Sequence, residues 1–338
     1  MINVMGFAPE QWLPIVFAGL MALSILAYVV LDGYDLGVGM LMAGVDRPER
    51  DIMIGSIGPF WDANETWLVL GIGLLLVAFP TAHGLVLTSL YLPVALMLLG
   101  LTLRGVAFEF RVKAPANRQR SWDKAFIGGS FLSTLAQGYM LGAYIMGFAE
   151  GWQPQAFALL AGLGLVAGYS FIGATWLILK TEGDLQRKAI GWAKTTLLIT
   201  ALGMAAISIA TPLVSERIFA KWFSFPALIM LAPIPLITAA IFASLWVFLK
   251  RMPRADHSLD IVPFIGAVSL FVLGFAGLAY SFFPYVVPEK LTIFEAASAP
   301  ESLFIILIGA SVVLPVIVAY SCFSYWVFRG KASALRYD

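Results

Sequence analysis

The sequence predicts an all-α integral membrane protein with about nine transmembrane helices, and three observations lead to this fold class. The first is composition: 60% of the 338 residues are hydrophobic and only 12% are charged, whereas soluble domains are about 45–50% apolar and about 25% charged. The second is that apolar runs of about 20 residues, long enough to span a bilayer as a helix, recur along the chain. The third is that basic residues gather in alternate breaks between these runs.

Four of the nine predicted helices lie in the N-terminal part of the chain. The run Trp12–Leu31 ends at the polar stretch "LDGYDLGVG", and Ile57–Phe79 contains the polar stretch "GPFWDANETW" near its start. Leu85–Leu103 ends directly before Arg104, and Phe126–Phe148 follows the longest non-apolar stretch of the sequence. Each run has the length and apolar content that a membrane-spanning helix requires.

The remaining five predicted helices follow at short intervals. Their boundaries are Ala156–Leu179, Thr195–Val214, Pro226–Leu249, Ile261–Phe283 and Leu303–Phe328. The breaks between them are too short to hold a soluble domain. We therefore expect one transmembrane domain over residues 1–338.

The distribution of basic residues predicts how the chain is oriented in the membrane. The breaks after the first, third, fifth, seventh and ninth runs contain two, six, four, three and three Lys or Arg residues, which is 18 of the 21 in the chain. Arg217, Lys221 and Lys290 fall on the other side. The positive-inside rule then predicts a periplasmic N-terminus and a cytoplasmic C-terminus, which requires an odd number of helices.

Charge and ligand chemistry exclude several classes of function. The net charge of +1, without a basic stripe, argues against nucleic acid as a partner. Haem iron needs His, Met, Cys or Tyr as axial ligands, but His83 and His257 fall in short breaks rather than in mid-membrane. Cys322 alone cannot form an intramolecular disulfide or hold an iron–sulfur cluster. We expect no metal and no haem bound by this chain itself.

The stretch "LDGYDLGVG" places carboxylates inside a predicted helix. Asp32 and Asp35 are three residues apart and share a helix face. A carboxylate at a helix centre costs roughly 2.5–3.5 kcal/mol, and such residues usually mark ion or proton routes. Gly33, Gly37 and Gly39 keep the backbone slim, which suits close helix packing. The alternative is that Asp35 lies at the cytoplasmic end of the helix and is simply solvated.

A second polar group occurs in "GPFWDANETW". Asp62, Asn64 and Glu65 fall within four positions, flanked by Trp61 and Trp67. The apolar run begins before this group, so a helix rising about 1.5 Å per residue would carry Asp62 below the membrane surface. The alternative is that the acids complement the macrodipole at a helix N-terminus.

Arg104 is a cation with apolar neighbours on both sides. At such a depth a cation needs a carboxylate partner. Asp32, Asp35 and Asp62 are the candidates from other helices, and Glu109 is the local competitor.

Several of these stretches carry a family resemblance. "LDGYDLGVGML", the segment from Arg47 to Val69 that includes "SIGPFWDANETWLV", "AFP" and "LRGVAFEFR" resemble subunit II of the cytochrome bd quinol oxidases. Trp122, Gly129–Ser130 and Gln137–Gly138 continue the match. The resemblance extends over the whole chain in length and helix count, and the compact length and "GYDLGVG" are similar to the cyanide-insensitive branch.

The resemblance implies an architecture and a set of partners. It implies two four-helix bundles plus one peripheral helix, with the first bundle over about 10–150 and the remainder over about 151–338. The partner is a subunit I that holds the b- and d-type haems and the quinol site, in the bacterial cytoplasmic (inner) membrane and its lipid. The complex oxidises quinol at the outer face and reduces oxygen to water with cytoplasmic protons. A small single-helix subunit and a structural quinone also occur in the family, and no motif here fixes either.

The resemblance also implies roles for residues. The Asp of the family's "WD.N" motif lies on a proton route toward the oxygen-reducing haem, and it matches Asp62. The "DG.D" acids line the same polar region, and some relatives carry Gln at the position of Glu65. We therefore expect a proton path formed by Asp62, Glu65, Asp32 and Asp35. We expect structural or partner-contact roles for Trp61, Asn64, Arg104 and Glu109.

Two other classes of function use similar residues. A proton-coupled secondary transporter would also place acids in the membrane, but it predicts discontinuous helices in paired repeats, and the sequence shows no repeat. A structural scaffold would use the acids only to anchor its partner subunit.

Overall fold

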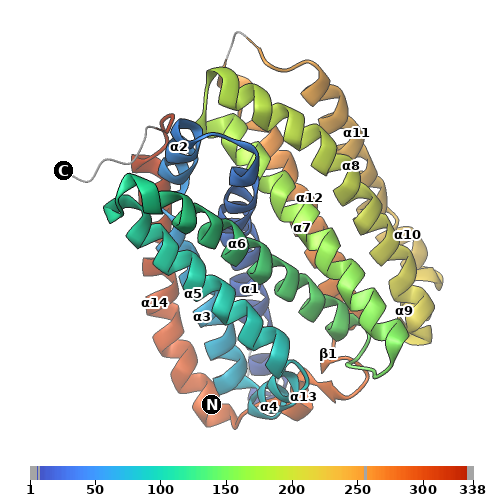
Figure 1. Ribbon diagram of the computed structural model, residues 1–338. Coiled ribbons are helices and arrows are strands. Elements are labelled where there is room, and N and C mark those ends of the chain that lie inside the picture. The colour runs from blue at the N-terminus through green and yellow to red at the C-terminus, as the bar shows by residue number, and fades with distance from the viewer. Residues whose placement is uncertain (1–5, 7, 255–256, 333–338) are drawn as a thin grey trace.

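The computed structural model describes residues 6, 8–254 and 257–332, and Arg336, one of the basic residues assigned above to the cytoplasmic side, lies outside them. Long helices make up most of this part of the chain (Figure 1). Their bounds are α1 Pro9–Leu41, α3 Trp61–Ala78, α5 Tyr91–Lys113, α6 Ala116–Ile145, α7 Trp152–Lys180, α8 Gly183–Val214, α11 Pro233–Lys250, α12 Val262–Phe282 and α14 Pro300–Val327.

Shorter elements connect the long helices. The short helices are α2 Arg47–Ile57, α4 Pro80–Ser89, α9 Glu216–Phe223, α10 Ala227–Leu231 and α13 Ile293–Ala296, with 3₁₀ turns at Met42–Gly44 and His257–Leu259. The strands β1 Tyr285–Val287 and β2 Leu291–Thr292 pair antiparallel.

The all-α membrane fold is confirmed. Within the described residues, eight helical spans are long and apolar enough to cross a membrane. The predicted run that is not among these eight, Phe126–Phe148, corresponds to α6, whose 30 residues give a length of about 45 Å, although charged side chains occupy its first turns. Each of the nine predicted runs therefore overlaps a long helix, although Leu85–Leu103 begins in α4 before it continues in α5, and Pro226–Leu249 covers both α10 and α11.

Two predicted boundaries are wrong in a way that matters for the site. The first helix continues to Leu41 rather than ending at Leu31, so "LDGYDLGVG" lies within a helix. The second predicted helix begins at Trp61 rather than at Ile57, because Ile57 is the last residue of α2 and a turn separates α2 from α3. Pro59 lies in the intervening turn, and because proline has no backbone N–H it cannot continue the hydrogen bonds of α2.

Helix α1 lies in the middle of the bundle, against α3, α6 and α7 (Figure 1). Its contact with α7 is made by glycines. A Cβ atom built on Gly173 would lie 2.6 Å from the carbonyl carbon of Gly37, so the two backbones touch and neither position can carry a side chain. Small residues allow this close approach between membrane helices.

Close contacts at glycines also join α5, α6 and α7. A Cβ on Gly129 of α6 would lie 2.6 Å from the carbonyl oxygen of Gly100 of α5. Further along α6, a Cβ on Gly142 would lie 2.5 Å from the Cα of Ala158 of α7. These contacts hold α5, α6, α7 and α1 at short distances, which brings the polar side chains of α1 and α5 together.

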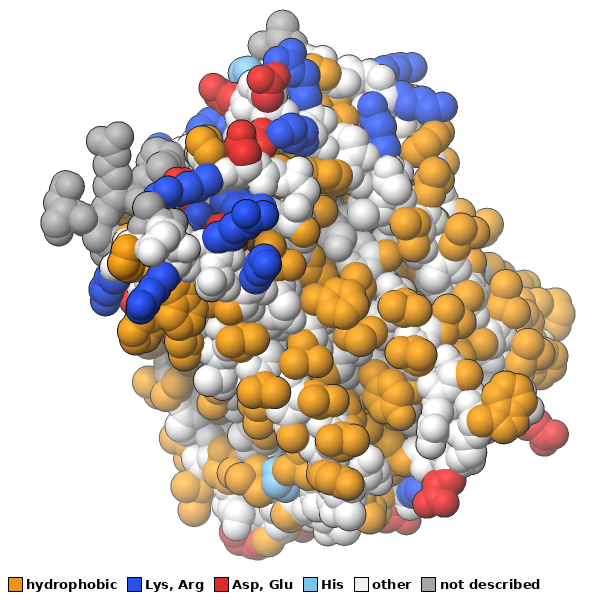
Figure 2. Space-filling model, in the orientation of Figure 1, with side chains coloured by type: hydrophobic (Ala, Val, Ile, Leu, Met, Phe, Trp, Pro, Cys, Tyr) orange, Lys and Arg blue, Asp and Glu red, His pale blue; other side chains and the backbone are white. Residues whose placement is uncertain are grey.

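Helix α14 is peripheral in contrast to α7. In the most apolar part of each helix, 56% of the residues of α7 are buried but only 6% of those of α14. The end of α14 is nevertheless anchored, because Lys180 Nζ donates to the carbonyl oxygen of Gly330 at 3.0 Å and Lys331 Nζ lies 2.8 Å from Asp260 Oδ2. A broad hydrophobic belt covers the molecule below an end rich in Lys and Arg (Figure 2).

Candidate functional site

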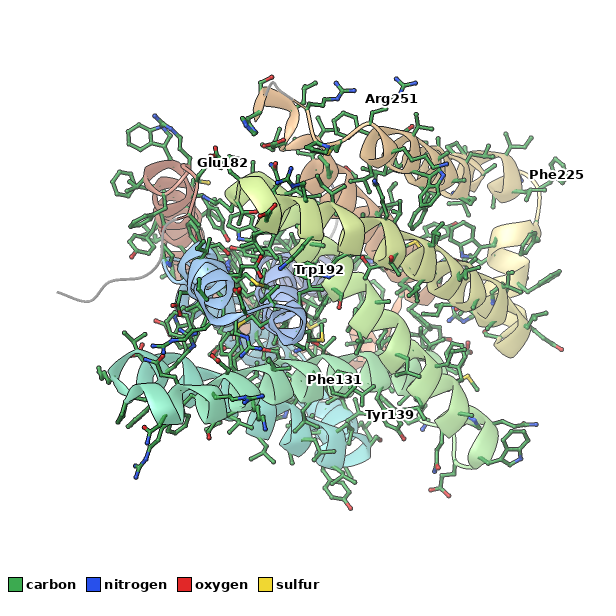
Figure 3. All side chains as sticks on the ribbon, turned by 45° about the horizontal axis from the view of Figure 1, so that its top comes forward. Phe131, Tyr139, Glu182, Trp192, Phe225 and Arg251 are labelled. Carbon is green, nitrogen blue, oxygen red and sulfur yellow. The ribbon has the colours of Figure 1, made fainter. Side chains whose placement is uncertain are left out.

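The candidate site begins on the C-terminal half of α1, where residues 32–39 are all buried. They are buried because α1 is packed on several sides by other helices (Figure 3). The side chains of Asp32 and Asp35 are 0% exposed. The alternative that Asp35 is a solvated residue at a helix end is therefore wrong.

Arg104 of α5 is the cation at the centre of the site, and its side chain is 0% exposed. Its Nη1 lies 2.6 Å from Asp32 Oδ1 and 3.0 Å from Glu65 Oε1. Its Nη2 lies 3.9 Å from Asp35 Oδ2. One guanidinium thus joins acids from α1 and α3 to α5, and we call these four residues the acid-rich cluster.

Asn64 connects the acid-rich cluster to two tyrosines. Its Nδ2 donates to Asp35 Oδ2 at 2.8 Å and to the Tyr34 hydroxyl at 3.0 Å. The hydroxyl of Tyr325, from α14, donates to Asn64 Oδ1 at 3.1 Å and lies 2.6 Å from that of Tyr34. Neither tyrosine was predicted from the sequence to belong to the site. Tyr34 directly precedes Asp35, and this adjacency could have indicated that Tyr34 belongs to the site. Nothing in the sequence links Tyr325 to Asn64.

A second set of polar side chains flanks Asp32. Gln137 Nε2 donates to the Tyr28 hydroxyl at 2.7 Å, and the Tyr169 hydroxyl donates to Gln137 Oε1 at 3.0 Å. Tyr28 lies one turn before Asp32 on the same face of α1. Tyr28 and Tyr169 were also missed, because isolated tyrosines in apolar helices resemble packing residues.

The acid-rich cluster has more acids than it can neutralise. It contains three carboxylates and one guanidinium, so full ionisation would leave an excess negative charge away from water, which is costly. Asp32 Oδ2, Asp35 Oδ1 and two nitrogens of Arg104 are buried without a hydrogen-bond partner among the described residues. Closely spaced carboxylates in such surroundings share protons. The arrangement is suited to bind and release a proton.

The structure does not bring Asp62 into this cluster. Asp62 lies in the first turn of α3, one turn before Glu65, and its side chain is exposed on the surface of the chain. Trp61 packs on the inner side, with its ring centre 5.8 Å from the guanidinium carbon of Arg104. Glu109 is exposed on α5 and forms no ion pair with a described residue. Of the four predicted acids of the path, three meet and one faces outward.

A balanced cluster lies further along α5. Arg111 Nη1 lies 2.7 Å from Asp51 Oδ1, and Arg111 Nε lies 2.5 Å from Asp123 Oδ1. Arg50 Nη1 lies 3.0 Å from Asp123 Oδ2. Two arginines and two aspartates, from α2, α5 and α6, neutralise one another, and we call them the balanced cluster.

The described residues contain no group of three or more His, Cys, Asp and Glu side chains that could hold a metal ion. His83 lies in α4 and His257 lies beyond the C-terminal end of α11. These two elements are at opposite ends of the molecule (Figure 1). The two histidines therefore cannot serve as the axial pair of one haem.

These features define a class of protein: a multi-helix integral membrane protein with a buried, acid-rich charge cluster between its helices. The sequence model of one family, described as cytochrome bd terminal oxidase subunit II, matches residues 13–328. The chain belongs to this family. It is accordingly part of an oxidoreductase complex, and the family implies a subunit I as its partner.

Individual relatives show similarity over nearly the full chain. The chain is 28% identical to cytochrome bd ubiquinol oxidase subunit 2 of Bacillus subtilis, over 93% of this chain and 95% of that protein. It is also 28% identical to cytochrome bd-I ubiquinol oxidase subunit 2 of Escherichia coli, over 92% and 93%. The fold resembles a chain of the bd oxidase from Geobacillus thermodenitrificans, with a TM-score of 0.74 over 95% of this chain and 100% of that chain at 16% identity.

Proposed function

We propose that this chain supports the haem-bearing subunit I of a quinol:oxygen oxidoreductase and contributes a proton path from the cytoplasm for the reduction of oxygen to water. The observation that carries the proton path is the acid-rich cluster, in which three carboxylates surround one buried arginine. A purely structural ion pair would need only one carboxylate for Arg104. The surplus acids can hold the protons that oxygen reduction consumes.

The path begins outside the cluster and passes inward through α3. Asp62 is exposed and lies three residues before Glu65, a rise of about 4.5 Å along the helix. The side chain of Glu65 is 27% exposed, whereas those of Asp32 and Asp35 are 0% exposed. Glu65 is thus the member of the cluster that is open to the outside. Protons taken up by Asp62 pass to Glu65 and then to Asp32 and Asp35.

The position of Asp62 also supports a contact with subunit I. Asp62 shares an exposed face of α3 with Thr66 and Val69, and Val69 is 72% exposed. A carboxylate that faced lipid would cost roughly 2.5–3.5 kcal/mol at a helix centre. The partner subunit, subunit I, covers this face of α3, and the haems and the quinol site belong to it.

The orientation follows from charge. Basic side chains gather at the upper end of the molecule in Figure 2, whereas α1 begins at the lower end (Figure 1). The positive-inside rule supports a cytoplasmic upper end and a periplasmic N-terminus. The acids then lie on the side from which protons are drawn, in the cytoplasmic membrane of a bacterium.

The transporter alternative gains little from the structure. One apolar span is discontinuous, with a break at Ala232 between α10 and α11. However, residues 226–249 contain no charged side chain, so the break offers no charged group to bind an ion. The acid-rich cluster lies on α1, α3 and α5, which are continuous where the acids occur.

The test replaces Asp35, the acid that lies farthest from Arg104, and leaves the closer partners Asp32 and Glu65 in place. In the purified complex with subunit I, we expect Asp35→Asn to keep the haem spectrum but to slow oxygen consumption per haem severely, because an amide cannot carry a proton. Asp51→Asn, in the balanced cluster, is the matched control and should leave turnover unchanged. Full turnover in the Asp35→Asn complex would end the proton-path proposal.

A further inference from the structure

A shallow groove lies on the outer side of α11, away from the acid-rich cluster. Its volume is about 400 Å³. Arg251 follows the last turn of α11 and lies at the outer edge of the bundle (Figure 3). The residues that line the groove are Ala243, Ser244, Val247, Phe248, Arg251 and Arg254.

The groove is apolar along its length and basic at one end. Ala243, Val247 and Arg251 follow one another at intervals of four residues, so they lie on one face of the helix. The rise from Ala243 to Arg251 is about 12 Å. The guanidinium carbon of Arg254 lies 4.8 Å from the centre of the Phe248 ring. This contact holds Arg254 at the basic end of the groove, together with Arg251.

The two arginines have no carboxylate partner among the residues that the structure describes. Among residues 8–254 and 257–332, neither Arg251 nor Arg254 forms an ion pair or a side-chain hydrogen bond. Lys188, another basic residue at the same end, is paired with Glu49 at 2.7 Å. Two unpaired guanidinium groups at one end of an apolar groove are complementary to a ligand with an anionic head and an apolar tail.

We propose that this groove binds an anionic phospholipid. Its phosphate accepts hydrogen bonds from Arg251 and Arg254, because the planar guanidinium matches phosphate geometry. One acyl chain lies along Val247 and Ala243. The basic end of the groove lies at the Lys- and Arg-rich end of the protein, where the positive-inside rule places the cytoplasmic leaflet, and basic pockets on that side bind anionic headgroups. The inference does not depend on the proposed proton path.

The experiment measures the phospholipid that stays with the purified complex, by mass spectrometry of the extracted lipid. One variant, Arg251→Gln/Arg254→Gln, removes both charges. A second variant, Ala243→Trp, fills the apolar part of the groove and keeps both arginines. The matched control, Arg118→Gln/Arg120→Gln, removes two exposed arginines from the same end of the protein.

We expect both groove variants to lose about one anionic phospholipid per chain relative to the control, with zwitterionic lipid unchanged. Retention of the lipid in either groove variant at the level of the control would overturn the proposal. A second arm titrates delipidated complex with phosphatidylglycerol vesicles or with inorganic phosphate. Phosphatidylglycerol alone should raise the melting temperature of the wild-type complex, and an equal rise with inorganic phosphate would identify a phosphate site instead of a lipid site.

Discussion

Two charged clusters lie on the same helix and differ in composition. Arg104 and Arg111 are seven residues apart on α5, about 10 Å along its axis. In the balanced cluster, two arginines meet two aspartates, and Asp51 remains 36% exposed. In the acid-rich cluster, one arginine meets three acids, and the groups of α1 and α5 are fully buried. The ratio of acids to cations, rather than the presence of an ion pair, separates a structural contact from a candidate proton site.

The comparison is tested most strongly by removing the two arginines. Arg104→Leu leaves buried acids without a cation, which costs roughly 3–5 kcal/mol, so we expect assembly with subunit I to fail. Arg111→Leu should cost less, because Asp51 reaches water and Arg50 still pairs with Asp123. The yield of haem-containing complex measures how far each of the two substitutions impairs assembly. Equal yields from the two variants would remove the distinction between the clusters.

Asp62→Asn should give the largest loss of turnover among variants that assemble. We expect the complex to form with a normal haem spectrum and the quinol oxidase rate per haem to fall to roughly a tenth or less, since positioned proton-transfer groups contribute about 10²–10⁴-fold. Asp62→Glu should keep part of the activity. Glu65→Gln should be milder, because the resemblance includes relatives with Gln at that position.

If Asp62 only complements the macrodipole of α3, the outcome differs. The loss would be a stability change of about 0.3–1 kcal/mol, with the rate per haem unchanged. A full rate per haem in the Asp62→Asn complex would therefore exclude its role in proton transfer.

The sequence predicted the helices and most of the acid-rich cluster for identifiable reasons. Apolar length marks a span, and the spacing of Asp32 and Asp35 places both on one side of α1. The need of Arg104 for a buried acid followed from its apolar neighbours. These are local properties of the sequence. The predicted residues meet in the structure because glycines such as Gly37 and Gly173 let α1 and its neighbours pack closely.

The orientation of Asp62 and Glu65 could not be predicted. The two are about 60° apart around a helix of 3.6 residues per turn, so a small rotation decides which one faces inward. That rotation is set by the turn at Gly58–Phe60, where α2 ends and α3 restarts. The contact between Tyr325 and Asn64 was equally hidden, because it joins positions 261 residues apart.

The balanced cluster should behave as a structural contact. Asp123→Asn weakens the ion pairs to both Arg50 and Arg111, and we expect a loss of about 1.5–3 kcal/mol, as for hydrogen bonds to charged groups. The melting temperature of the complex should fall while the rate per haem stays at the wild-type value. A lower rate per haem at full stability would instead make this cluster part of the proton path.

The smallest expected effect is at Tyr325, where the peripheral helix α14 reaches the acid-rich cluster. Tyr325→Phe keeps the ring stacked on Phe60, at 4.4 Å between centres, and removes only the hydroxyl, which donates to Asn64 Oδ1 and is hydrogen-bonded to the Tyr34 hydroxyl at 2.6 Å. Each lost hydrogen bond of this kind costs about 0.5–1.5 kcal/mol. We expect a slightly lower melting temperature and a modest fall in the rate per haem, because Asn64 in turn donates to Asp35.

Tyr320→Phe is the matched control for this variant, since Tyr320 lies on the same helix and is 64% exposed. It should change neither the melting temperature nor the rate. A change in stability alone in Tyr325→Phe would assign the hydroxyl to anchoring α14. A fall in the rate beyond what the control shows indicates that Asn64 must be held in place for Asp35 to exchange its proton, which would extend the acid-rich cluster to the last helix of the chain.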